Sequence, residues 1–185
     1  MSAAISAEIR IAKPFSFVGP QRLQVEWGGA RRLGAWIAGL FPQRRVLVVR
    51  DAFLRRSGLI APALEDLKAA GFAVTVFAEV VSDPPEALVE TCCAAGRAAA
   101  CDLVIGIGGG SSLDVAKLAA LLIATPQALA GIYGIGKACG SRLPLIQVPT
   151  TAGTGSEATD IAILTTPGDA KMGVVAPQLH ADAVL

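Results

Sequence analysis

The chain has 185 residues, a net charge of +1, 53% hydrophobic residues and 5% aromatic residues. The length fits one domain or slightly more, and the near-neutral charge with few aromatic rings argues against a nucleic-acid partner. The longest apolar run, residues 118–124, is far shorter than the ~20 residues of a membrane helix, and Glu8 and Arg10 interrupt the N-terminus before any secretory signal. We expect a globular protein of the cytoplasm.

Strand and helix patterns alternate along most of the chain. Val46–Val49 is a continuous apolar run typical of a strand covered on both faces, and Gly71 is a residue type that commonly ends a helix. The predicted elements are a hairpin (15–18 and 23–27), helices (33–40, 59–67, 84–100 and 113–124) and strands (46–49, 72–80, 103–107 and 143–148). Such alternation predicts an α/β fold with a parallel sheet and helices on both faces.

The last part of the chain has a different pattern. Ile161–Thr165 and Lys171–Val175 predict two short strands joined by a turn at Pro167-Gly168-Asp169, and Ala183–Leu185 resembles the start of another strand. A sequence that stops on an apolar run without a polar tail is typical of one part of a longer protein.

A glycine-rich segment follows the strand at 103–107. Gly108, Gly109 and Gly110 lack a Cβ, so a diphosphate could approach their backbone closely. The helix that begins after Ser111 has first N–H groups without intrahelical partners, and its dipole adds partial positive charge. The segment therefore predicts a phosphate-binding loop.

Two common phosphate-loop motifs do not fit this segment. The pattern Gly106-x-Gly108-x-x-Ser111 nearly matches a dinucleotide fingerprint, but no acid stands between Asp114 and Glu157 to bind the ribose. A Walker A loop would need Ser or Thr directly after Lys117. A turn without a ligand remains the alternative, with Ser111 and Asp114 as a capping pair and Asp114 and Lys117 as an i,i+3 ion pair.

A second motif lies after the strand at 143–148. Residues 149–157 read Pro-Thr-Thr-Ala-Gly-Thr-Gly-Ser-Glu, and with Gly-Gly-Gly-Ser-x-x-Asp-x-x-Lys they resemble the iron-containing (group III) alcohol dehydrogenases. The resemblance extends from 46–50 through Ser82-Asp83-Pro84 to Lys171-Met172-Gly173. It implies that residues 1–185 form a Rossmann-like dinucleotide-binding domain. The all-helical domain that holds a divalent metal, iron or zinc, through one Asp and three His in that family is absent from this chain.

The resemblance also implies which residues contact the cofactor. By position these are Gly109, Gly110 and Ser111 at the diphosphate, and Thr150, Thr151 and Thr154 on the path to the nicotinamide. Hydroxyl and backbone N–H groups suit that path, because they orient a cofactor without adding a full charge near the reacting centre.

Two charged positions complete the implied site. Lys171 matches a family lysine near the cofactor, although by itself it reads as a solvated lysine in a hairpin. Asp83 stands where the family usually has Asn beside the adenosine, and an Asx-type turn before Pro84 is the alternative.

Asp51 ends the first long strand, at the family position that faces the adenine ribose. A carboxylate there accepts hydrogen bonds from the ribose hydroxyls and repels a 2′-phosphate, which favours NAD over NADP. Arg50, Arg55 and Arg56 lie close enough in sequence to tolerate that phosphate, and a solvated Asp that opens a helix is the alternative.

Neither catalytic residues nor metal ligands are expected within the chain. The four cysteines have no C-x-x-C spacing and predict reduced, partly buried thiols: Cys92, Cys93, Cys101 and Cys139. His180 is the sole histidine and predicts a surface residue. For Glu157 and Asp114 we expect structural roles, in anchoring the loop and capping the helix respectively.

The resemblance implies an oxidoreductase, an NAD(P)-dependent alcohol dehydrogenase or carbonyl reductase, of which this chain is the cofactor-binding half and is inactive alone. A metal-free maleylacetate-type reductase, a dehydroquinate synthase-type lyase and a non-catalytic nucleotide-binding module are the alternatives. We expect a small alcohol or carbonyl compound as substrate and a homodimer or higher homo-oligomer, since apolar edge strands are seldom left bare.

Overall fold

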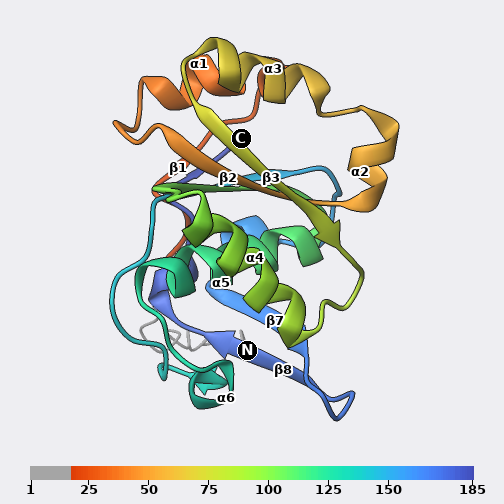
Figure 1. Cartoon of the computed structure of the whole chain (residues 1–185), viewed down its shortest axis with the longest axis vertical. Coiled ribbons are helices and arrows are strands. Elements are labelled where there is room, and N and C mark those ends of the chain that lie inside the picture. The colour runs from red at the N-terminus through yellow and green to blue at the C-terminus, as the bar shows by residue number, and fades with distance from the viewer. Residues whose placement is uncertain (1–17) are drawn as a thin grey trace, which may run out of the picture.

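The computed structural model describes residues 18–185, which form a layered α/β domain (Figure 1). The main sheet has six parallel strands in the order β1-β9-β6-β4-β2-β3. Their bounds are β1 (Arg22–Leu23), β2 (Arg45–Asp51), β3 (Ala73–Val80), β4 (Leu103–Gly108), β6 (Leu145–Pro149) and β9 (Ala183–Val184). The predicted parallel sheet is confirmed.

Helices cover both faces of this sheet because both faces of its central strands are apolar. One face packs against the 3-10 helix η1 (Gly29–Arg32), α1 (Leu33–Ala38) and α3 (Ala61–Ala69); the other packs against α4 (Glu86–Ala98) and α5 (Gly110–Ala124). The core divides accordingly: Val46 and Val48 of β2 belong to the first apolar cluster, and Leu47 and Val49 to the second. This alternation reflects the two-residue period of a strand.

A smaller sheet lies against the far side of α5 (Figure 1). It has the order β5-β8-β7, with β7 (Ile161–Thr165) and β8 (Lys171–Val175) antiparallel and β5 (Gly134–Ile135) parallel to β8. α5 is therefore enclosed between two sheets, and its residues from Ser112 to Leu122 are all buried. An apolar pattern all round the helix is what such a position requires.

The N-terminal hairpin differs from its prediction within the described residues. Of the arm expected at 23–27, only Leu23 is in a strand, the two-residue β1, which pairs in parallel with β9 at one edge of the main sheet. Of the other arm, residues 15–17 lie outside the described part of the chain.

The short connecting elements were only partly anticipated. They are α2 (Ala52–Ser57), α6 (Leu129–Ile132), η2 (Ser156–Ala158) and η3 (Pro177–Leu179). α2 realises the alternative in which Asp51 opens a helix, and Gly71 follows the end of α3 with a φ of 86°. No helix among residues 18–185 combines the length and apolar character needed to cross a bilayer.

Candidate functional site

The carboxyl ends of three neighbouring strands bring the predicted site residues to one edge of the main sheet. Asp51 ends β2, Gly108 ends β4, and Thr150 follows β6. The backbone N–H of Thr150 donates to the carbonyl of Gly108 at 3.0 Å, so the two loops are joined directly. Open α/β sheets bind ligands at this edge.

The glycine segment begins α5 without help from a side chain. Gly109 is the N-cap residue, and no side chain hydrogen-bonds to the first turn. The alternative capping pair of Ser111 and Asp114 is therefore not formed. The first intrahelical bond runs from Leu113 N–H to the Gly109 carbonyl at 3.1 Å, so the preceding N–H groups remain available to an anion.

The three glycines differ in how strongly packing within the protein requires them. Gly108 has a φ of 150°, and a Cβ there would lie 2.7 Å from Ser112 Oγ. At Gly110 a Cβ would lie 3.1 Å from Ser156 Oγ, whereas at Gly109 the nearest atoms, in Thr151, are 3.5 Å away. Close packing within the protein thus demands glycine at 108 and favours it at 110. At Gly109 a Cβ would make only ordinary van der Waals contacts, so packing within the protein does not require glycine there.

The threonine loop packs against these glycines. Thr151 is the nearest neighbour of the Gly109 Cβ position, and Thr154 lies 3.4 Å from that of Gly110. Both threonines are exposed, as is Thr150. The residues that sequence reasoning assigned to the diphosphate and to the nicotinamide path are therefore contiguous in space.

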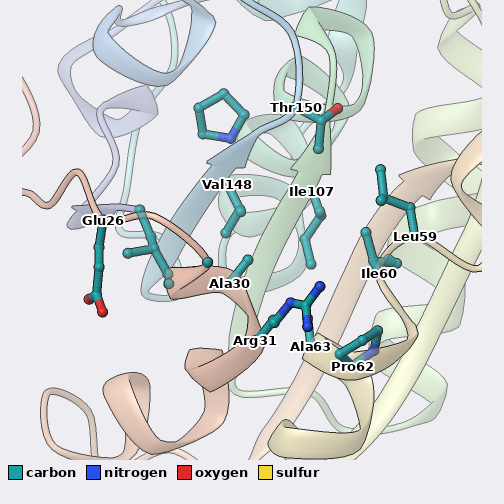
Figure 2. A pocket seen from close by; sticks show the side chains of 14 residues that line it. Glu26, Ala30, Arg31, Leu59, Ile60, Pro62, Ala63, Ile107, Val148 and Thr150 are labelled. Atoms are coloured by element: carbon teal, nitrogen blue, oxygen red, sulfur yellow. The ribbon is translucent and has the colours of Figure 1, made fainter.

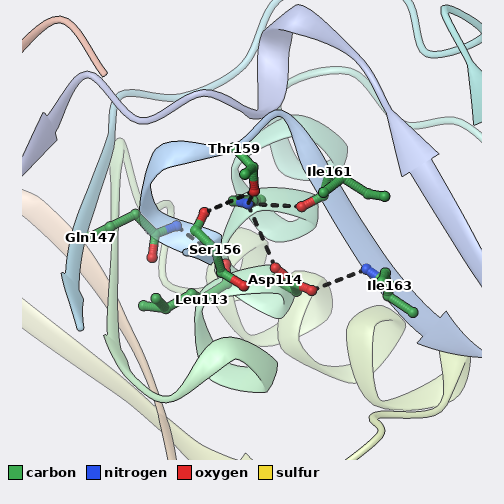
Figure 3. A network of polar contacts seen from close by, with 8 residues as sticks. Leu113, Asp114, Gln147, Ser156, Thr159, Ile161 and Ile163 are labelled. Carbon is green, nitrogen blue, oxygen red and sulfur yellow. Dashed lines mark hydrogen bonds and ion pairs between the residues drawn. The ribbon is translucent and has the colours of Figure 1, made fainter. Parts of the chain in front are cut away.

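A buried polar network joins α5, the helix that follows the glycine segment, to Thr159 and to strand β7 (Figure 3). Lys117 is fully buried, and its Nζ donates to the Ile161 carbonyl at 2.8 Å and to Thr159 Oγ1 at 3.3 Å. Asp114 Oδ2 accepts from the Ile163 N–H at 3.1 Å. The predicted Asp114–Lys117 ion pair is present at 3.6 Å. Asp114 therefore does not cap α5 as predicted; it attaches β7 to that helix.

Burial opposes charge at both members of this pair. It raises the pKa of Asp114 and lowers that of Lys117, while their mutual attraction acts in the opposite direction on each. Glu157 stays a predicted anchor of the loop; its Oε2 is buried without a hydrogen-bond partner among the described residues. Sequence reasoning missed the burial of Lys117, although its position between apolar residues of an apolar helix was a signal.

Asp51 has one oxygen engaged and one directed at the glycine segment. Its Oδ1 accepts from the Leu54 N–H at 2.8 Å as the N-cap of α2. Its Oδ2 is 3.4 Å from the position of a Cβ on Gly108. Arg50 turns to α2, where its Nη1 donates to the Leu54 carbonyl at 3.3 Å. Burial and the nearby Arg55 lower the pKa of Arg50.

Asp83 and Lys171 meet although 88 residues separate them. Lys171 Nζ donates to Asp83 Oδ1 at 2.6 Å, and both side chains are about 60% exposed. Asp83 has a φ of 50°, in the left-handed region that Asp tolerates. Sequence reasoning had selected both residues without linking them.

An apolar pocket of about 350 Å³ opens beside the glycine segment (Figure 2). Ile107 and Val148, from the ends of β4 and β6, form its floor; Leu59 and Ile60, which follow α2, form one wall. Thr150 lies at its rim. Sequence reasoning missed this pocket because its lining comes from segments far apart in the chain.

Metal-ligating residues do not gather in residues 18–185: no group of three or more His, Cys, Asp or Glu there could hold an ion. All four cysteines are free thiols; three are buried and Cys139 is exposed. His180 is half-buried. Asp182 forms a bidentate pair with Arg142 at 2.5 and 2.9 Å.

Comparison with known proteins gives a consistent family. The family model described as iron-containing alcohol dehydrogenase matches residues 20–185. The chain is 38% identical over 157 residues to long-chain-alcohol dehydrogenase 1 of Geobacillus thermodenitrificans, covering 82% of this chain and 37% of that protein. It is 34% identical over 122 residues to the NAD-dependent methanol dehydrogenase of Bacillus methanolicus, covering 66% and 32%.

Solved structures share the fold. A crystal structure of 1,3-propanediol oxidoreductase superimposes with a TM-score of 0.86 at 26% identity, covering 93% of this chain and 45% of the other. Sulfoacetaldehyde reductase from Bifidobacterium kashiwanohense, in complex with NAD+, gives a TM-score of 0.82 at 30% identity, covering 93% and 46%. This chain thus spans about a third of these curated relatives and less than half of these solved structures.

Proposed function

This chain belongs to the iron-containing alcohol dehydrogenase family, and from that premise we propose that it is the NAD-binding part of an alcohol dehydrogenase or carbonyl reductase. The observation that carries the proposal is the uncapped first turn of α5 beside Gly109, where backbone N–H groups lack intrahelical partners and packing within the protein does not itself require glycine. A diphosphate supplies the negative charge and small cross-section that this arrangement favours. Gly109, Gly110 and Ser111 would bind it.

Asp51 supports NAD as the preferred cofactor. Its cap to α2 holds the carboxylate at the strand end, and Oδ2 is free to accept from ribose hydroxyls. The same charge repels the 2′-phosphate of NADP. Arg50, which could have offset that repulsion, is engaged with the Leu54 carbonyl.

The apolar pocket suits the adenine ring. Its wall at Leu59 and Ile60 continues from the helix that Asp51 caps, so a ribose at Asp51 leaves the base next to that wall. Ile107 and Val148 offer an apolar surface for the ring, as in most small-molecule sites. Thr150, Thr151 and Thr154 would then line the path from the diphosphate to the nicotinamide.

Bound NAD would supply hydride chemistry, taking hydride from an alcohol or returning it to a carbonyl compound. The residues described here orient the cofactor through hydroxyl and backbone groups. They do not fit a catalytic metal, since residues 18–185 offer no cluster of ligands and His180 is the chain's sole histidine. We therefore expect the 185-residue chain to bind NAD without oxidising alcohols, and we assign no step to a metal.

Calorimetric titration of the chain with NAD and NADP tests the proposal. We expect NAD to bind more tightly, and Gly109→Val to weaken its binding by about tenfold or more, because a branched side chain would enter the diphosphate space. The fold should tolerate this change, since Gly109 has a φ of −76° and its Cβ would make only ordinary contacts.

Gly131→Val is the matched control. Gly131 lies in α6, and a Cβ there would meet no atom within 4 Å. The control should leave NAD affinity unchanged. Wild-type chain that binds neither dinucleotide, or a folded Gly109→Val chain that binds NAD as well as wild type does, would contradict the proposal.

A further inference from the structure

The exposed ion pair between Asp83 and Lys171 is close in distance but contributes little to the stability of the fold. Its atoms approach to 2.6 Å, yet 60% and 62% of the two side chains remain exposed. A pair so open to water contributes little to stability, because solvent screens the attraction and the long Lys171 side chain loses conformational freedom.

Backbone contacts hold the two segments together without the pair. The Thr165 N–H donates to the Pro84 carbonyl at 3.0 Å, and Thr165 Oγ1 donates to the Asp83 carbonyl at 3.1 Å. Pro85 and Thr165 also form a parallel bridge. The ion pair between Asp83 and Lys171 is therefore not needed to hold the β7–β8 hairpin against the Asp83 segment.

Strand β7 connects the segment of this pair to the early turns of α5. Ile163 of β7 donates its N–H to Asp114 in the second turn of that helix, and Thr165, two residues further along β7, contacts the Asp83 segment. Two residues of strand span about 7 Å. Because Ile161 contacts Lys117 and Ile163 contacts Asp114, β7 runs toward the N-terminal end of α5, and Thr165, the register partner of Lys171, lies on the side of the proposed diphosphate site.

We propose that Asp83 is an internal competitor for Lys171: it holds the ammonium in the free protein and yields it to the anionic diphosphate of a bound dinucleotide. This inference rests on the proposed function. When Lys171 leaves, the Asp83 carboxylate loses its counter-ion near a negatively charged ligand, and that cost lowers affinity. Asp83 therefore limits how tightly the cofactor is held and favours its release.

Asp83→Asn separates this role from a structural one. Asn tolerates the left-handed φ of 50° as Asp does, and it keeps an acceptor oxygen while removing the charge. We expect the NAD affinity of the chain, measured by calorimetry at low ionic strength, to rise by about threefold to tenfold. Thermal melting should be nearly unchanged.

Asp169→Asn is the matched control, because Asp169 lies in the turn of the same hairpin, is exposed and has a φ of 57°. It removes the same charge without touching Lys171, so NAD affinity should stay the same. Lys171→Met should weaken NAD binding. In the Lys171→Met background, the gain from Asp83→Asn should fall below about twofold, since no ammonium remains to be released.

The outcomes separate the two proposals. If wild-type chain binds no NAD, both are overturned. If it binds NAD but Asp83→Asn brings no gain, or an equal gain appears with Asp169→Asn or persists without Lys171, the competitor role is overturned and NAD binding stands. Loss of affinity in Asp83→Asn would instead mean that the carboxylate itself contacts the ligand, which also overturns the competitor role.

Discussion

Two acid–lysine pairs connect to the β7–β8 hairpin, and they differ chiefly in their exposure to water. Asp114 and Lys117 lie inside the protein at 3.6 Å, with the Lys117 side chain fully buried. Asp83 and Lys171 lie on its surface at 2.6 Å. The shorter pair is the weaker contributor to stability, because water competes for both of its charges.

This difference shows that distance alone does not reveal what an ion pair does. The buried pair is surrounded by hydrogen bonds that leave Lys117 no alternative partner. Neither member can be removed without leaving a desolvated charge. The surface pair has no such constraint, so its partners can exchange for a ligand. The buried pair attaches β7 to α5, and the surface pair is available to bind a ligand.

Lys117→Met is the change that would separate the pairs most strongly. It should reduce the free energy of unfolding by about 3–5 kcal/mol, because Asp114 is left buried without its counter-charge. Urea denaturation of the purified chain measures this loss. Lys171→Met, the same substitution in the surface pair, should cost less than about 1 kcal/mol. Equal losses in the two variants would remove the distinction between the pairs.

Asp51 has a structural role as the cap of α2 and a proposed role in selecting NAD, and two substitutions separate these roles. Asp51→Ala should cost about 1 kcal/mol of stability through loss of the α2 cap. Asn is an equally good cap, so Asp51→Asn should keep that stability while narrowing the preference for NAD over NADP by about threefold or more. Urea denaturation and calorimetric titration give the two quantities. An unchanged preference in Asp51→Asn would mean that selectivity arises elsewhere.

The thiols also differ in their exposure to water, and we expect this difference to have the smallest effect on stability. Burial raises the pKa of Cys93 to about 11 and also raises that of Cys92. Unfolded thiols ionise near pH 9.0 while the buried ones stay protonated, so stability should decline as the pH rises above 9.0.

In the native chain, a thiol reagent at pH 8 should label exposed Cys139 first. Rapid labelling of all four cysteines would contradict their burial.

Local signals in the sequence were sufficient for the central strands of the main sheet, for the β7–β8 hairpin and for the strand-to-helix turn at the glycine segment, but not for the two-residue strands β1 and β5. β7 and β8 have the predicted bounds because apolar alternation and a Pro-Gly-Asp turn are encoded by neighbouring residues. The Asp83–Lys171 pair and the apolar pocket depend on how distant segments pack, which no local pattern encodes. Asp114 was misjudged because a capping motif competed with a tertiary contact to β7, and the tertiary contact prevailed.

The enclosure of α5 between two sheets joins ligand binding to the unfolding of the whole domain. Its buried turns reach water only when both apolar layers are lost, so we expect their amide hydrogens to be among the slowest in the domain to exchange. The same helix offers its first turn to the ligand. A dinucleotide bound there would slow amide hydrogen exchange along the entire helix. Binding at the edge of the sheet would therefore stabilise the centre of the molecule.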